Sequence, residues 1–285
     1  MTEEVVQIGR DKNLSGVVSL PPSGGAPATG VVLMNAGVIH RIGPHRFNVK
    51  LARRLAHRGY PVIRLDLTGL GDSAVPVSAL PYEAQSVADL QAAMDSLSAL
   101  TGATSFLLAG ICSGARNAWA TALADERVRG IWMLDGHFLP TKKTPLHFWS
   151  RKVAHEGLWP LSTRLALRMV RQLRSRAGAT SADPRSVPWD SAQARRRFLD
   201  ELSRLVGRGV HPCFAYSGSN LRDYSYDNQL EDVFRGKVPA GSVTVHFMPE
   251  VDHTLTTLGG QAKVAAQIEA FCVSLTDNVA TRRER

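Results

Sequence analysis

The sequence predicts a protein of the α/β class, with a mostly parallel sheet that helices cover on both faces. Four short and largely apolar runs have the length and composition of strands, namely 30–34, 60–66, 106–109 and 128–134, and the continuous apolar run at 30–34 indicates burial on both faces. Between them lie segments in which apolar residues recur at helical spacing, namely 47–57, 82–100 and 115–124. Strands that alternate with helices in this rhythm indicate parallel pairing with right-handed crossovers.

Both ends of the chain extend the predicted sheet. Residues 5–8 and 14–20 have the composition of strands and are joined by a polar turn. Further along the chain, strands at 210–216 and 243–247 and a helix at 260–275 continue the pattern. These segments therefore belong to the same α/β unit as the central block.

The rhythm of strands and helices stops in one long stretch, 141–208. Within it, apolar residues recur at helical spacing over 158–173 and again over 198–206. We therefore expect a core of two parts, 1–140 and 209–285, interrupted by a helical lid at 141–208 that covers the C-terminal edge of the sheet.

The composition excludes several classes of protein. The 285 residues are 44% hydrophobic, which is ample for a core, and no stretch approaches the ~20 apolar residues of a membrane span. Residues 1–4 are acidic and lack the apolar centre of a secretory signal. The three cysteines, Cys112, Cys213 and Cys272, are too few and too scattered for a disulfide framework or a zinc site. We therefore expect a cytoplasmic protein without a cofactor or a metal.

The positive charge is concentrated in the predicted lid. This segment holds about 15 Lys and Arg against about five Asp and Glu, enough to account for the net charge of +9. Arg164, Arg168 and Arg171 share one face of a predicted helix. Such a face is either solvated or a site for an acidic partner, such as a carrier protein or the phosphates of CoA. Nucleic acid is disfavoured because few aromatic residues interleave with the basic ones and no nucleic-acid-binding motif occurs.

The strand at 106–109 leads into a Gly-x-Cys-x-Gly turn and then into a helix. This spacing is that of a nucleophile elbow, with Cys112 where serine is usual. Gly110 and Gly114 lack the bulk that would crowd so tight a turn. If Ser113 were the nucleophile, Ile111 would have to fill a position that requires a small residue. We therefore predict Cys112 as the nucleophile and the Ser113 backbone N–H as an oxyanion donor; the alternative is a buried structural cysteine.

The loop after the strand at 30–34 is where the second oxyanion donor is expected. Gly37 is the preferred candidate for this backbone N–H, and Val38 is the alternative. Four basic or titratable side chains crowd the same loop, namely His40, Arg41, His45 and Arg46. They either contact the substrate or form a solvated polar surface.

Three local patterns follow one another in an order typical of one superfamily. They are the run RLDLTGLGDS at 64–73, the elbow at Cys112, and Asp252-His253-Thr254 after the last strand. Over most of its length the chain therefore resembles the α/β-hydrolase superfamily. The block that contains RIGPHR at 41–46 resembles the exosortase-system-associated hydrolases and related serine-aminopeptidase-like members, and the cysteine elbow is similar to that of dienelactone hydrolases.

The resemblance implies a catalytic triad in the order nucleophile, acid, base. His253 is then the base, because it lies where the superfamily keeps its histidine. The position that aligns with the usual acid is Asn220, which could only orient the imidazole. We prefer Asp223 as the acid, with Asp135, at the end of the preceding strand, as the alternative location known in the superfamily.

Such a site would act on an ester or thioester. Attack by Cys112 would form an acyl-thioenzyme, and a thioester exchanges readily with thiols, amines and alcohols. This favours a thioesterase, acyltransferase or cyclase, as used in the biosynthesis of natural products or polysaccharides. Two alternatives are a non-hydrolytic enzyme that uses His253 for elimination or proton transfer, and a decayed site on a binding protein. A set of apolar residues in the predicted lid would suit a hydrophobic acyl group or simply pack together: Phe148, Trp149, Leu158, Trp159 and Trp189.

Overall fold

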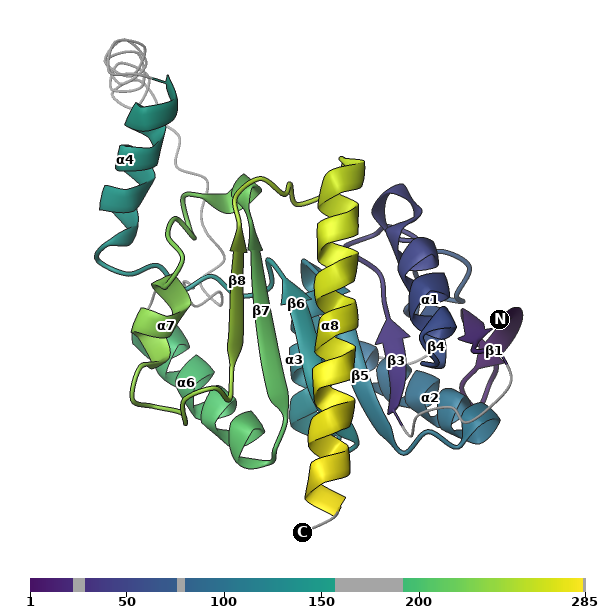
Figure 1. Ribbon diagram of the computed structural model, residues 1–285. Coiled ribbons are helices and arrows are strands. Elements are labelled where there is room, and N and C mark those ends of the chain that lie inside the picture. Colours follow the sequence, from purple (N-terminus) through teal and green to yellow (C-terminus); the bar gives the residue numbers. More distant parts are fainter. Residues whose placement is uncertain (23–28, 76–79, 157–191, 284–285) are drawn as a thin grey trace.

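The computed structural model describes residues 1–22, 29–75, 80–156 and 192–283. Its sheet has eight strands in the order β1-β2-β4-β3-β5-β6-β7-β8 (Figure 1). The strands are β1 (Thr2–Ile8), β2 (Leu14–Leu20), β3 (Thr29–Leu33), β4 (Val62–Leu65), β5 (Ser105–Ile111), β6 (Val128–Leu134), β7 (His211–Ser217) and β8 (Thr244–Met248). β2 pairs antiparallel with β1 and β4, and the other neighbouring strands pair parallel. The predicted mostly parallel sheet is confirmed.

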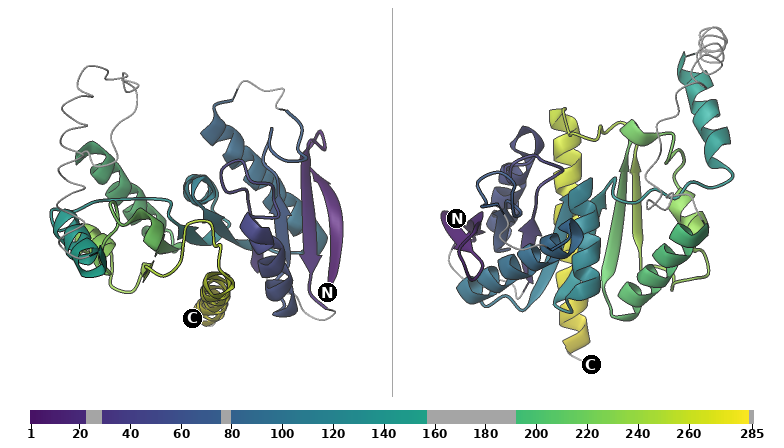
Figure 2. Two further views of the ribbon diagram at one scale, coloured as in Figure 1. Left: turned by 90° about the horizontal axis from the view of Figure 1, so that it is seen from above. Right: turned by 180° about the vertical axis from the view of Figure 1, so that it is seen from behind.

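Helices cover both faces of this sheet, as the view from above shows (Figure 2). The described helices are α1 (Phe47–His57), α2 (Tyr82–Thr101), α3 (Ser113–Ala124), α4 (Thr144–Glu156), α6 (Ala192–Gly207), α7 (Gln229–Phe234) and α8 (Leu258–Arg283), with 3-10 turns η1 (Pro44–Arg46) and η2 (Gly218–Asn220). On one face, Leu51 of α1 and Ile268 of α8 are buried in one apolar cluster. On the other face, Met94 of α2, Ala118 of α3 and Leu202 of α6 belong to a second cluster. Burial of two apolar layers against one sheet is what holds this fold together.

The last part of the predicted lid lies in the core. In α6, Phe198, Leu202 and Leu205 are at most 5% exposed and pack with the sheet and α3 in the second cluster. The spacing of i, i+4 and i+7 forms one apolar stripe, which is the pattern of a helix that covers a sheet. α6, which we expected to belong to the lid at 141–208, therefore packs with the core.

The other described part of the predicted lid is α4, which projects beyond the body of the sheet (Figure 1). Leu146 and Trp149 of α4 are 72% and 38% exposed, respectively. The expected helix at 158–173, with Arg164, Arg168 and Arg171, lies outside the described residues, as do Leu158, Trp159 and Trp189. Among the described residues, no helix is both long enough and apolar enough to cross a bilayer.

Candidate active site

Cys112 occupies a strained turn between β5 and α3. Its backbone has φ 59° and ψ −117°, a conformation that L-residues rarely adopt. Only glycine fits on either side: a Cβ at Gly110 would come within 2.3 Å of the carbonyl carbon of Gly114, and a Cβ at Gly114 within 2.7 Å of the backbone oxygen of Asn35. Cys112 thus has the strained backbone, and its flanking glycines the close packing, that a nucleophile elbow requires.

His253 lies on the loop after β8 and is oriented by a carboxylate. Its Nδ1 is 2.8 Å from Oδ2 of Asp135, and its backbone N–H donates to the Ser219 hydroxyl at 2.8 Å. Asp135 follows directly after β6, and its side chain is fully buried. The backbone N–H and the hydroxyl of Ser217 also donate to this carboxylate, at 2.9 and 2.6 Å. Three hydrogen bonds thus hold the buried charge and direct one of its oxygens at the imidazole.

The preferred acid, Asp223, is not the residue that the structure brings to His253. Among the described residues, no hydrogen bond joins His253 to the side chain of either Asp223 or Asn220. The backbone of Asp223 is fastened elsewhere, because its N–H donates to Asn220 at 2.9 Å and its carbonyl accepts from Gln229 at 2.5 Å. The turn after β7 leads Asp223 away, while the parallel pairing of β6 with β7 places Asp135 beside Ser217. The alternative location is the one that forms the contact.

The electrostatics of His253 follow from two partners. The hydrogen bond with Asp135 raises the pKa of His253 and partial burial lowers it, and with the smaller raising effect of the neighbouring Cys112 the pKa of His253 is about 9. The imidazole is therefore protonated at neutral pH. The structure joins His253 to Asp135 by a hydrogen bond and brings Cys112 close enough to affect the pKa of the imidazole, at the C-terminal edge of the sheet.

The other two cysteines differ from Cys112 in accessibility. Cys213 and Cys272 are buried, and burial raises the pKa of both thiols, that of Cys272 to about 12. Cys112 is partly exposed. It is thus the cysteine that a reagent or substrate can reach.

The expected oxyanion donors have an unexpected arrangement. The N–H of Gly37 donates to the hydroxyl of Ser113 at 2.8 Å. We expected this N–H to be free to bind the substrate oxygen, but it is already engaged. Val38, the alternative, has a side chain that is 84% exposed, at the tip of a turn closed by a hydrogen bond from Ile39 N–H to the Ala36 carbonyl at 3.1 Å. Ser113 is the first residue of α3, so its own backbone N–H lies at the positive end of the helix dipole.

A buried carboxylate that sequence reasoning did not single out anchors this loop. The Asp66 side chain is 0% exposed and forms an ion pair with Arg41. It also accepts the backbone N–H of Arg41 at 2.6 Å and the side-chain amide of Asn35 at 2.8 Å. The position of Asp66 within the run at 64–73 was the available sequence signal, but its contacts with the loop after β3 depend on the pairing of β4 with β3.

His40, Asp66 and Asp72 also have the spacing of metal ligands. However, the Arg41 guanidinium already binds both carboxylates, and its distance to Asp72 is 2.7 Å. A positive charge therefore occupies the position between these carboxylates.

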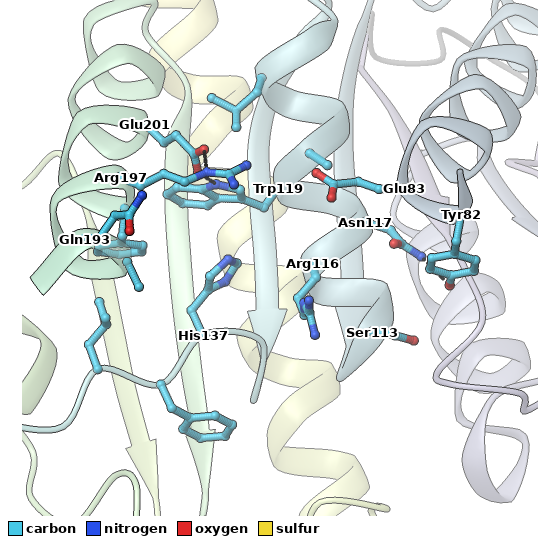
Figure 3. A pocket seen from close by; sticks show the side chains of 16 residues that line it. Tyr82, Glu83, Ser113, Arg116, Asn117, Trp119, His137, Gln193, Arg197 and Glu201 are labelled. Carbon is cyan, nitrogen blue, oxygen red and sulfur yellow. Dashed lines mark hydrogen bonds and ion pairs between the residues drawn. The ribbon is translucent and has the colours of Figure 1, made fainter. Parts of the chain in front are cut away.

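A cavity of about 430 Å³ lies beside the elbow, between α2, α3, α6 and the loop after β6 (Figure 3). Its walls include Trp119 and Phe198, whose rings stack with centroids 5.3 Å apart. Ser113, Arg116 and His137 also line it. Burial and the charge of Arg116 lower the pKa of His137 to about 3, so this histidine is neutral at physiological pH. The cavity thus combines aromatic walls with polar groups and adjoins the nucleophile through Ser113.

A family comparison agrees with this architecture. A model of the alpha/beta hydrolase fold family matches residues 31–191, which is more than half of the 285 residues. The chain belongs to the α/β-hydrolase fold family. A comparison with curated proteins gives no match.

Solved structures share the fold at low sequence identity. A putative α/β-hydrolase of unknown function from Agrobacterium tumefaciens has a TM-score of 0.58 and 12% identity, over 97% of each chain. The meta-cleavage product hydrolase from Pseudomonas fluorescens IP01 has a TM-score of 0.57 and 13% identity, over 95% of this chain and 97% of that chain. The esterase domain of a Rhodothermus marinus protein has a TM-score of 0.55 and 16% identity, over 95% of this chain and 96% of that chain. At these identities the likeness shows the fold alone.

Proposed function

We propose that the protein cleaves or transfers the acyl group of an ester or thioester, with Cys112 as nucleophile, His253 as acid and base, and Asp135 as the residue that orients His253. The observation that carries this proposal is the hydrogen bond between His253 and the buried Asp135, together with the strained turn that holds Cys112 close to the imidazole. A nucleophile, a base and an orienting carboxylate in hydrogen-bond contact are the arrangement that acyl transfer requires.

The protonation of His253 defines the starting state of the reaction. Cysteine attacks as the thiolate, so the reacting state of the pair is the Cys112 thiolate beside the His253 imidazolium. In the first step the Cys112 sulfur attacks the carbonyl carbon, a C–S bond forms, and the carbonyl π electrons move to oxygen. The resulting oxyanion lies near the N–H of Ser113, where the α3 dipole also favours negative charge.

Collapse of this intermediate completes acylation. The carbonyl reforms, the bond to the leaving alcohol or thiol breaks, and the proton of the His253 imidazolium passes to the leaving group. His253 is then neutral and can take a proton from an incoming nucleophile, which attacks the acyl-thioenzyme and releases Cys112. Water would give hydrolysis, whereas an amine, alcohol or thiol would give acyl transfer or ring closure.

The cavity beside the elbow supplies the place for the acyl group. Its size falls in the range of about 300–1,000 Å³ typical of ligand sites, and its aromatic walls favour an apolar acyl chain. We propose that an acidic carrier protein or CoA presents the acyl group. We further propose that the protein is related to the exosortase-system-associated hydrolases. It would then act in the cytoplasm, in the biosynthesis of natural products or polysaccharides.

The test is to trap the acyl group on sulfur. We expect incubation with an acetyl or longer acyl N-acetylcysteamine thioester, followed by rapid acid quench and intact mass measurement, to show one acyl adduct. Peptide mapping should place it on Cys112, and the variant Cys112→Ala should carry none. Cys213 and Cys272 are internal controls, because their thiols are buried.

Two outcomes would contradict the proposal. An adduct elsewhere, or turnover that survives Cys112→Ala but not His253→Gln, would favour proton-transfer chemistry in which the thiol is a bystander. No adduct with any ester or thioester, together with an unreactive Cys112 toward iodoacetamide, would favour a binding protein with a decayed site.

A further inference from the structure

We infer that the side-chain hydroxyl of Ser113, rather than the backbone N–H of Gly37, completes the oxyanion hole. This inference rests on the proposed function, because an oxyanion forms only if a nucleophile attacks a carbonyl. It assigns to Ser113 two donors to the same oxygen: its backbone N–H and its hydroxyl. The usual second donor would then act indirectly, through the hydroxyl that it binds.

The first support is the direction of the hydrogen bond between the two candidates. The Gly37 N–H donates to Ser113 Oγ at 2.8 Å. In this bond the hydroxyl is the acceptor, so its own hydrogen stays available for donation. Among the described residues, no acceptor takes that hydrogen. Ser113 is partly exposed and lines the cavity beside the elbow. Figure 3 shows it at the N-terminal end of α3.

The second support is cooperativity between hydrogen bonds. A hydroxyl that accepts from a backbone N–H becomes a stronger donor, because the two bonds polarise the same O–H group. The hydroxyl therefore relays the polarity of the Gly37 amide toward the cavity. It also lies at the N-terminal end of α3, where developing negative charge is favoured.

The third support is that Gly37 is held where it is. The Asn35 side chain donates to the Ile39 carbonyl at 2.8 Å, which closes the loop on both sides of Gly37. The same amide donates to the buried Asp66 at 2.8 Å, and Arg41 binds Asp66 through both its backbone and its guanidinium. Freeing the Gly37 N–H by a loop movement would have to loosen these contacts, whereas rotating the Ser113 O–H disturbs none of them.

The decisive experiment compares a reaction that passes through an oxyanion with one that does not. Acylation of Cys112 by the acetyl N-acetylcysteamine thioester forms a tetrahedral oxyanion. Alkylation by iodoacetamide displaces iodide at a saturated carbon and forms none. For Ser113→Ala we expect acylation to slow about 10- to 100-fold, somewhat less than the usual effect of losing an oxyanion donor because the Gly37 N–H is released. Alkylation should stay within about twofold of the wild type.

Two further variants sharpen the comparison. Ser113→Thr keeps a hydroxyl at the same atom and should restore most of the acylation rate. Ser150→Ala removes an exposed hydroxyl from α4 whose partner among the described residues is the His147 carbonyl, at 3.0 Å, and should leave both reactions unchanged. Both rates are measured at Cys112, and labelling of Cys213 and Cys272, which are buried in the folded protein, reports any misfolded fraction of a variant.

Each outcome decides a different question. Acylation of Ser113→Ala at the wild-type rate or faster would overturn the inference, since the hydroxyl would then merely block Gly37. Equal slowing of acylation and alkylation would also overturn it, because Ser113 would act on the thiol and not on the oxyanion. A wild-type protein that alkylates but never acylates would refute the proposed function itself.

Discussion

Replacing Asp135 by Asn tests the proposed triad at its buried carboxylate. The carboxylate accepts from the Ser217 N–H, the Ser217 hydroxyl and His253 Nδ1. An amide offers only one acceptor oxygen, and its NH₂ group would favour the wrong tautomer of the imidazole. We therefore expect both the pKa of His253 and the rate of acylation to fall.

The size of the effect follows from the His253 pKa. Its rise from 6.5 to about 9 corresponds to at most about 3 kcal/mol. The His253 side chain is 32% exposed, and Cys112 contributes part of the rise, so we expect roughly half of that value, or about a 10-fold loss of acylation rate at pH 7.5. NMR titration of the imidazole would measure the pKa directly, and thioester kinetics would measure the rate.

Asp223→Asn is the matched control. It makes the same change in the residue that the sequence favoured, and Asp223 has no hydrogen bond to His253 among the described residues. Its His253 titration and acylation rate should match the wild type. If Asp223→Asn lowered the His253 pKa while Asp135→Asn left it near 9, the assignment of the orienting carboxylate would be refuted.

Three further predictions concern stability. Gly110→Ala should cost about 1–3 kcal/mol in urea unfolding, because its Cβ would meet backbone atoms of Gly114 at 2.3 Å; an unchanged midpoint would contradict the packing of the elbow. Arg41→Ala should cost about 3 kcal/mol because it leaves the buried Asp66 charge without its partner, whereas Asp72→Ala should cost less than about 1 kcal/mol because its side chain is 62% exposed. Because the folded state raises the His253 pKa to about 9, its stabilisation is complete below about pH 6.5 and is lost as the pH rises through 9. The difference in unfolding free energy between wild type and His253→Gln should shrink over that window, and a constant difference would refute the raised pKa.

The sequence alone was sufficient for the fold class and for two members of the candidate site. Apolar runs of strand length, alternating with amphipathic helices, are local patterns, and a parallel sheet is the simplest structure that buries all of them. The elbow was also readable, because a turn that excludes side-chain bulk leaves glycines at fixed positions around Cys112. His253 followed from the resemblance, through its place after the last strand.

Only the tertiary structure decided between the carboxylates and between the oxyanion donors. Asp135 and Asp223 both follow strands, and what separates them is which one the neighbouring strand supports: β7 brings Ser217 to Asp135, while the turn after β7 directs Asp223 elsewhere. The contact between Gly37 and Ser113 joins residues 76 positions apart, and α6 packs on the sheet although the chain around it had seemed an insertion. Local patterns determine which elements form and which faces are apolar, but hydrogen bonds between distant loops depend on strand order and register, which no single segment encodes.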